Sequence, residues 1–156
     1  MRFTTALALA CFLSFRAVAQ DDHKARNEAL CKFSGGRSIT VTYPHSEKTG
    51  ITTLRTTEDL ATVHGVNLSA GAYELRPEKN SNNNWVLGIS RIENSKLTHL
   101  PPVPLAAKRP DSPLLVFNIS FDQTGGTCRM RWASEESNTL LWLDFTAKDS
   151  DVPVIP

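Results

Sequence analysis

The chain lacks an excess of charge of either sign, and beyond its N-terminal segment it lacks long apolar runs. It has 17 Lys and Arg against 16 Asp and Glu in 156 residues. Domains that bind nucleic acid concentrate basic side chains on one face, so the missing basic stripe excludes a nucleic-acid partner. A basic amphipathic helix is missing too, which argues against stable insertion of the folded domain in a membrane.

Histidines and cysteines are scarce, and their spacing does not indicate a metal site. The chain has four His and three Cys. None of the histidines belongs to an HExxH or a His-x-His pattern, so no metal or cofactor is predicted. A metal centre would have to be assembled by folding alone. We expect the histidines in solvated loops: His23, His45, His64 and His99.

Motifs for covalent or acid–base catalysis are missing as well. Ser90 lies in Gly-Ile-Ser-Arg and not in the Gly-x-Ser-x-Gly turn that exposes a nucleophilic serine. The acidic pairs at 58–59 and 135–136 are sequence neighbours, which point to opposite faces of a strand. They therefore do not face each other as the two carboxylates of a glycosidase do. No catalytic residue is predicted, and we expect a protein that is not an enzyme.

What is present begins with an export signal. Arg2 precedes the largely apolar stretch Phe3–Phe15, and Ala17-Val18-Ala19 has the small-x-small form after which signal peptidase cuts. The stretch is shorter than the roughly 20 apolar residues that cross a bilayer. We predict a signal peptide at 1–19 and a mature protein that is periplasmic or secreted. The alternatives are an uncleaved anchor and lipidation at Cys11.

Cleavage would leave about 137 residues, enough for one domain with a core, and two cysteines, Cys31 and Cys128. An even number of cysteines in an oxidising compartment favours a disulfide. The bond would close a loop of about 97 residues and add up to about 5 kcal/mol of stability. A two-cysteine metal site is the alternative, but neither cysteine has a second Cys or a His at ligand spacing.

Alternation of apolar and polar residues predicts strands along most of the chain. It is clearest between Gly65 and Arg91, where two alternating runs flank an Asn-rich turn. Five prolines between Leu97 and Pro113 indicate an edge strand or an extended crossing over one end of the sheets. Further strands are predicted at 38–43, 52–57, 115–121, 128–132 and 140–145.

These patterns predict an all-β protein, an antiparallel β-sandwich of about 7–8 strands with little helix, with a barrel as the alternative. We expect a flexible N-terminal segment at 20–30, the β-sandwich domain at 31–148 and a flexible tail at 149–156.

One strand suggests a binding face. Its alternation places Trp142 and Asp144 opposite Leu141, Leu143 and Phe145. If that face is exposed, an aromatic ring beside a carboxylate forms a ligand platform. In the alternative interpretation both faces are buried, or Trp142 packs under the proline-rich segment.

Three blocks of the chain, Cys31–Pro44, Val66–Ser90 and Phe117–Trp132, are spread over most of the length of the predicted mature protein. They contain Cys-x-Phe, then Ala-Gly-x-Tyr-x-Leu, then Phe-x-Ile-x-Phe-Asp with a second Cys before a Trp. In this order the blocks resemble a bacterial secreted family known as domain of unknown function 2911. The resemblance implies a secreted bacterial β-sandwich and no established activity.

The interval between the first two blocks departs from that family, which usually has a polar Trp-Arg-Thr-Gly-Ala-Asn stretch there. The segment Thr52–His64 is shorter and has neither this Trp nor this Asn. We expect any function particular to this chain in the segment, so His64 joins Trp142 and Asp144 as a candidate ligand-binding residue.

Three functions remain open. The first is an exported, non-enzymatic module that binds an envelope or extracellular partner or a small ligand. The second is a hydrolase assembled from distant residues, which requires His64 or His99 within hydrogen-bond reach of an Asp or Glu in one pocket. The third is binding of carbohydrate or another small ligand on an aromatic face around Trp142.

Overall fold

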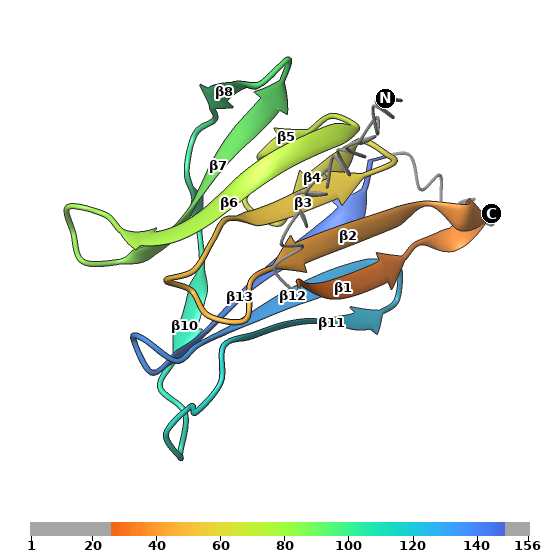
Figure 1. Cartoon of the computed structure of the whole chain (residues 1–156). Coiled ribbons are helices and arrows are strands. Elements are labelled where there is room, and N and C mark those ends of the chain that lie inside the picture. The colour runs from red at the N-terminus through yellow and green to blue at the C-terminus, as the bar shows by residue number, and fades with distance from the viewer. Residues whose placement is uncertain (1–25, 149–156) are drawn as a thin grey trace, which may run out of the picture.

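The computed structural model describes residues 26–148, which form two antiparallel sheets packed face to face (Figure 1). The predicted signal peptide and the predicted tail at 149–156 lie outside the described residues. Within 26–148 the only helical element is a 3-10 turn, η1 (Ser34–Gly36). No helix in this part of the chain is long and apolar enough to span a membrane. The predicted all-β sandwich is confirmed.

Sheet A has the strand order β1-β2-β3-β6-β7-β8, and β9 pairs with the start of β7 beyond the end of β8. All neighbours are antiparallel. The strands are β1 (Asn27–Lys32), β2 (Ser38–Tyr43), β3 (Thr52–Thr56), β6 (Gly71–Lys79), β7 (Trp85–Glu93), β8 (Lys96–His99) and β9 (Val103–Pro104).

Sheet B has the order β11-β12-β13-β4-β5, and β10 pairs with the start of β13. Its long strands come from the C-terminal part of the chain, and its edge is completed by short strands inserted between β3 and β6. The strands are β4 (Leu60–Thr62), β5 (Asn67–Leu68), β10 (Ala106–Lys108), β11 (Asn118–Thr124), β12 (Thr127–Ser134) and β13 (Thr139–Ala147).

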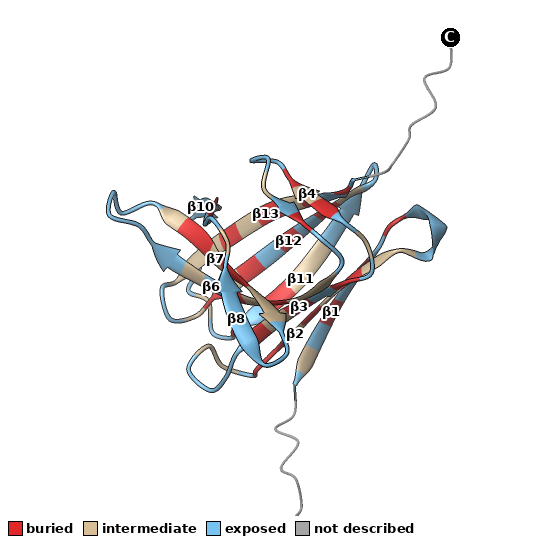
Figure 2. Cartoon of the chain, turned by 90° about the horizontal axis from the view of Figure 1, so that it is seen from above, coloured by how far each residue is buried: buried red, intermediate tan, exposed pale blue. Residues whose placement is uncertain are grey.

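The core lies between the sheets and follows the two-residue period of the strands (Figure 2). In β2, Ile39, Val41 and Tyr43 are buried while the residues between them are partly exposed. Sheet B contributes the matching layer from β12 and β13, including Met130 and Phe145. Removing this apolar area from water is the main favourable term in folding.

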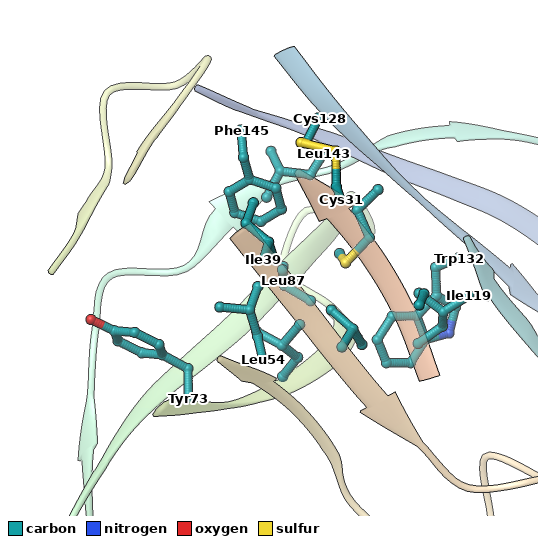
Figure 3. Close-up of a cluster of buried hydrophobic side chains, with 14 of the residues drawn as sticks. Cys31, Ile39, Leu54, Tyr73, Leu87, Ile119, Cys128, Trp132, Leu143 and Phe145 are labelled. Carbon is teal, nitrogen blue, oxygen red and sulfur yellow. A yellow bond between two sulfur atoms is a disulfide. The ribbon is translucent and has the colours of Figure 1, made fainter. Parts of the chain in front are cut away.

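The two sheets are tied together along what we call the disulfide side, formed by β1, β2, β11 and β12. Cys31 of β1 is bonded to Cys128 of β12, with 6.2 Å between their Cα atoms, so the predicted disulfide is confirmed (Figure 3). Next to it, the Phe117 ring packs 5.4 Å from the rings of both Tyr43 and Trp132. A covalent bond and an aromatic cluster therefore hold β1 and β2 to sheet B.

The described structure starts earlier than predicted. Strand β1 begins at Asn27, whereas the sequence suggested a flexible segment up to residue 30. The charged residues of β1 made this strand hard to predict, because only Ala29 and Cys31 point into the core. Backbone pairing with β2, from Asn27 opposite Tyr43 to Lys32 opposite Ser38, overrides this polar composition.

A second boundary is also wrong. The strand predicted from Leu115 begins at Asn118, and the side chains of Leu115 and Val116 are 85% and 65% exposed. The backbone just before Asn118 is not paired with a neighbouring strand. The Leu114 N–H instead donates a hydrogen bond to the side chain of Asn138 at 2.9 Å. Alternation alone does not report where pairing starts.

The proline-rich segment forms both structures that were predicted as alternatives, first edge strands and then an extended crossing. Strands β8 and β9 line the edge of sheet A, and the chain then crosses to sheet B, where β10 pairs with β13. Because prolines and turns divide these edges, residues 26–148 form thirteen strands, more than the number predicted.

Candidate functional site

Two tight turns align polar residues across the outer face of β6, β7 and β8, which we call the hairpin side. At the β6–β7 turn the Asn80 carboxamide oxygen accepts the N–H groups of Asn82 and Asn84, both at 3.0 Å. The β7–β8 turn consists of Asn94 and Ser95, both with positive φ, as hairpin turns of this length require. The turns therefore help to set the register of these strands.

This register places Glu74 opposite Ser90, and Ser90 opposite His99. Directly opposite residues on adjacent strands have Cβ atoms roughly 5 Å apart. The Ser90 hydroxyl and His99 Nδ1 are hydrogen-bonded at 2.7 Å. Ser90 is only 9% exposed, whereas His99 lies on the exposed edge strand β8. The hydrogen bond therefore connects a buried hydroxyl with a solvent-exposed imidazole.

The pair lines a depression of about 460 Å³, which we call the hairpin hollow. This size falls within the range of about 300 to 1,000 Å³ that is usual for small-molecule sites. Gly88 helps to keep it open: a Cβ there would lie 3.2 Å from the Arg76 carbonyl oxygen and 3.6 Å from a Glu78 carboxylate oxygen. The walls are Glu74, Arg76, Glu78, Gly88, Ile89, Ser90, Leu97, His99, Leu100 and Pro102.

The charges in this hollow are partly compensated. Arg76 pairs with Glu74 at 3.0 Å, and the Glu74 side chain is only 12% exposed. Among the described residues, no cation pairs with Glu78. The walls of the hollow therefore contain two carboxylates and one guanidinium.

A second depression, the Glu47 hollow, begins on the other side of the Glu74–Arg76 pair and measures about 320 Å³. Glu47 Oε1 accepts the Trp132 indole N–H at 2.9 Å. Its Oε2 accepts the Ser134 hydroxyl at 2.9 Å and the Glu136 N–H at 3.3 Å. Glu47 thus links the β2–β3 loop to sheet B through neutral donors.

A third depression, the end hollow, has a volume of about 200 Å³ and shares Glu47, Pro77 and Glu136 with the Glu47 hollow. In Figure 1 the β6–β7 turn, the β2–β3 loop and the β12–β13 turn gather at this end of the sandwich. Neighbouring hollows share wall residues, so the three adjoin, and we call them together the groove.

The predicted candidates Trp142 and Asp144 lie on the outer face of sheet B, opposite the buried Leu141, Leu143 and Phe145. Trp142 is partly buried between Arg131 of β12 and Ala106 of β10. The platform is therefore bordered on one side by β10, a strand within the proline-rich segment.

Asp144 is occupied by a salt bridge. Arg129 donates two hydrogen bonds to its carboxylate, at 2.7 and 2.9 Å, and these hold the pKa of Asp144 below its usual value. A depression of about 500 Å³ adjoins this pair, with walls formed by Asp122, Thr124, Thr127, Arg129 and Asp144. Neither Trp142 nor His64 is part of these walls, so the three predicted residues do not share one hollow.

The remaining histidines are dispersed. His64 lies exposed in the turn after β4, His45 bonds the Asn27 side chain at 3.2 Å, and His23 lies outside the described residues. His99 shares the hairpin hollow with Glu74 and Glu78, but its hydrogen bond goes to Ser90. Across residues 26–148 no three His, Cys, Asp or Glu side chains gather in a possible metal site.

Ser90 and His99 were not recognised as partners from the sequence. Ser90 was tested only against a nucleophile motif, and His99 was assigned to a solvated loop. A usable signal was present: with Asn94-Ser95 as a two-residue hairpin turn, Ser90 and His99 fall directly opposite each other. Residues at equal distances before and after a two-residue hairpin turn lie opposite each other, and this rule identifies the pair.

No family model, no curated protein and no solved structure matches this chain. The resemblance to domain of unknown function 2911 therefore stays a prediction, and function has to be argued from the groove itself.

Proposed function

We propose that this protein is an exported, non-enzymatic binding module that holds a small polar ligand in the hairpin hollow. The supporting observation is the convergence of Glu74, Ser90 and His99, from three strands, on one depression of about 460 Å³. Binding sites typically combine a concave shape with a few convergent polar groups.

The walls offer complementary chemistry. Carboxylates accept hydrogen bonds from hydroxyl or amine groups, and Arg76 donates them. Leu97, Leu100 and Pro102 provide apolar surface for the carbon skeleton of a ligand. The site is built on paired strands and not on a long loop, so little conformational entropy is lost when a ligand binds.

Export is part of the proposal. The Cys31–Cys128 disulfide fits an oxidising compartment, as the predicted signal peptide does. Fractionating a bacterial host that expresses the full chain and weighing the product tests this part. We expect a periplasmic or secreted protein shortened by 19 residues, as the small-x-small motif predicts. An uncleaved cytoplasmic product would contradict it.

Binding is tested by two-dimensional NMR of the mature protein with a hexose, an amino acid, a diamine and a dicarboxylate as probes. We expect at least one probe to shift amide signals of the residues that line the hairpin hollow. Replacing His99 by Gln should weaken this binding about tenfold, the usual effect of losing one good polar contact. The matched control is His64→Gln, which alters an exposed histidine outside the hollow. Shifts confined to another surface, or none at all, would contradict the proposal.

The Ser90–His99 pair also supports a second candidate, an esterase. In that reaction His99 would take the Ser90 proton as Ser90 attacks an ester carbonyl and would return it to the departing alcohol, after which water would hydrolyse the acyl-serine to the free acid and regenerate Ser90. The position is unfavourable, because Ser90 lies mid-strand between β6 and β8, and the nearby backbone N–H groups bond within the sheet instead of stabilising an oxyanion. We expect identical rates of p-nitrophenyl acetate hydrolysis by the wild type and Ser90→Ala. A rate that depends on Ser90 would establish the esterase.

A further inference from the structure

The groove that includes the hairpin hollow indicates a more specific class of ligand. The hairpin and Glu47 hollows meet at Glu74 and Arg76, which line both. The two hollows therefore adjoin at this ion pair. The combined space suits an elongated ligand better than a compact one.

Charge indicates what such a ligand carries. Four carboxylates line the groove: Glu47, Glu74, Glu78 and Glu136. Two of them have cationic partners, since Arg76 pairs with Glu74 at 3.0 Å and Lys48 with Glu136 at 3.5 Å.

The other two carboxylates, Glu47 and Glu78, have no cationic partner among residues 26–148. Glu47 accepts its three hydrogen bonds from neutral donors, which leave its negative charge in place. Glu78 lies over the space left by Gly88. The two uncompensated charges are therefore in different hollows, with the Glu74–Arg76 pair between them.

We propose that the groove binds an elongated chain with two or more protonated amines, one near Glu78 and one near Glu47. This inference rests on the proposed function, because it names the ligand class of the same site. Glu47 is half-buried and Glu78 is exposed, so we expect the attraction for an amine to be stronger at Glu47 than at Glu78. Protonated amines in a chain are found in linear polyamines and in lysine-rich peptides, and both share this recognition chemistry.

The inference is tested by titration calorimetry and NMR on the mature protein with spermine, tri-lysine, butylamine and maltotriose. We expect spermine or tri-lysine to bind at least about tenfold more tightly than butylamine, since each additional ion pair multiplies affinity. Affinity should fall with added salt, because screening weakens charge pairs. Tighter binding of spermine would identify the ligand as a polyamine, and tighter binding of tri-lysine would identify it as a peptide.

Variants separate the two ends of the groove. We expect Glu78→Gln and Glu47→Gln each to weaken spermine binding about tenfold. Because Glu47→Gln also changes bonds that hold the fold, Ile51→Lys serves as a second variant. Ile51 is 48% exposed and lines the Glu47 hollow, so a lysine there repels a cation without removing those bonds. The matched control is Glu28→Gln, on an exposed position of β1 outside the groove.

The outcomes also separate this inference from the proposed function. If butylamine binds as tightly as spermine and Ile51→Lys has no effect, only the hairpin hollow is used and the elongated cation is refuted. If maltotriose binds in the hairpin hollow and no amine does, the ligand class is wrong while the proposed function stands. If no probe shifts any signal of the hairpin hollow, both are overturned.

Discussion

The disulfide side and the hairpin side of the sandwich differ in what their side chains do. On the disulfide side, Cys31, Tyr43 and Phe117 are buried between the two sheets, and their contacts are made within the protein. On the hairpin side, Ser90, His99 and Glu78 line a depression open to solvent. One side holds the sheets together, and the other leaves polar groups available.

The difference shows how one small sandwich separates stability from recognition. A binding site leaves polar groups without full protein partners, which lowers stability, and the remainder of the fold has to compensate for that loss. Here the compensating bonds lie on strands other than those that carry the hollow. Variants on the disulfide side should therefore change unfolding and leave binding intact, and variants in the hollow should do the reverse.

The largest effect is expected from removing the disulfide. The double variant Cys31→Ser, Cys128→Ser should lower the free energy of unfolding by about 2 to 5 kcal/mol, because the bond restrains a long loop in the unfolded chain. Urea unfolding followed by tryptophan fluorescence measures this loss. NMR signals from the hairpin hollow should keep their positions, and their displacement would show that the two sides are not independent.

The next effect is expected from Glu47→Gln. The change leaves one of the donors from Trp132, Ser134 and Glu136 facing an amide NH₂ group, which costs about 1 to 3 kcal/mol of stability when a buried donor loses its acceptor. Thermal unfolding measures it. The control is Glu136→Gln, since its pair with Lys48 is at the surface and should contribute below about 0.5 kcal/mol. Equal losses in both variants would contradict the structural role of Glu47.

A smaller effect is expected from Tyr73→Phe on β6. The Tyr73 hydroxyl donates to the Ser69 carbonyl at 2.5 Å and accepts from Arg91 at 3.0 Å, so its loss should cost about 1 kcal/mol. Burial raises the pKa of this phenol above its ordinary value of 10.0, an effect that Arg91 opposes.

Because the folded chain keeps Tyr73 protonated to higher pH than the unfolded chain does, its ionisation favours unfolding. The stabilisation is complete below pH 10.0 and is lost as the pH rises through the raised pKa. Urea unfolding at a series of alkaline pH values should show a steeper decline for the wild type than for Tyr73→Phe. Parallel curves would exclude Tyr73 as the titrating group.

The smallest effect is expected from Tyr43→Phe, the matched variant on the disulfide side. The Tyr43 hydroxyl makes a single bond, to Asn118 Oδ1 at 2.9 Å, and Asn118 is exposed, so water can replace the hydroxyl. We expect a loss of about 0.5 kcal/mol, since the ring contact with Phe117 is kept. A loss larger than that of Tyr73→Phe would reverse the order expected from the hydrogen bonds.

Much of the fold could be predicted from local patterns. Alternation identified β2, β6, β7, β12 and β13 and assigned Leu141, Leu143 and Phe145 to the core side. It failed at the ends of strands, at Asn27 and Leu115, because pairing partners and not side-chain polarity decide where a strand begins. The strands β4, β5, β9 and β10, of two or three residues each, were too short for a pattern to show.

The candidate site could be predicted far less well. Trp142 and Asp144 were chosen because they lie two residues apart, which guarantees a common face but not a cavity. The Glu47–Trp132 bond joins residues 85 positions apart, through a loop with no regular structure. Such a contact depends on how the sheets stack, and no local pattern encodes it.

Within the strands that it identified, the sequence by itself determined which side chains point inward, because a strand alternates its faces every two residues whatever its neighbours are. With only two cysteines in residues 26–148, it also predicted the disulfide between Cys31 and Cys128. Only the tertiary structure decided that Glu74, Ser90 and His99 form one row and that the groove continues to Glu47. Turn geometry, strand order and sheet stacking control these neighbours, and they are properties of the whole fold and not of a local segment.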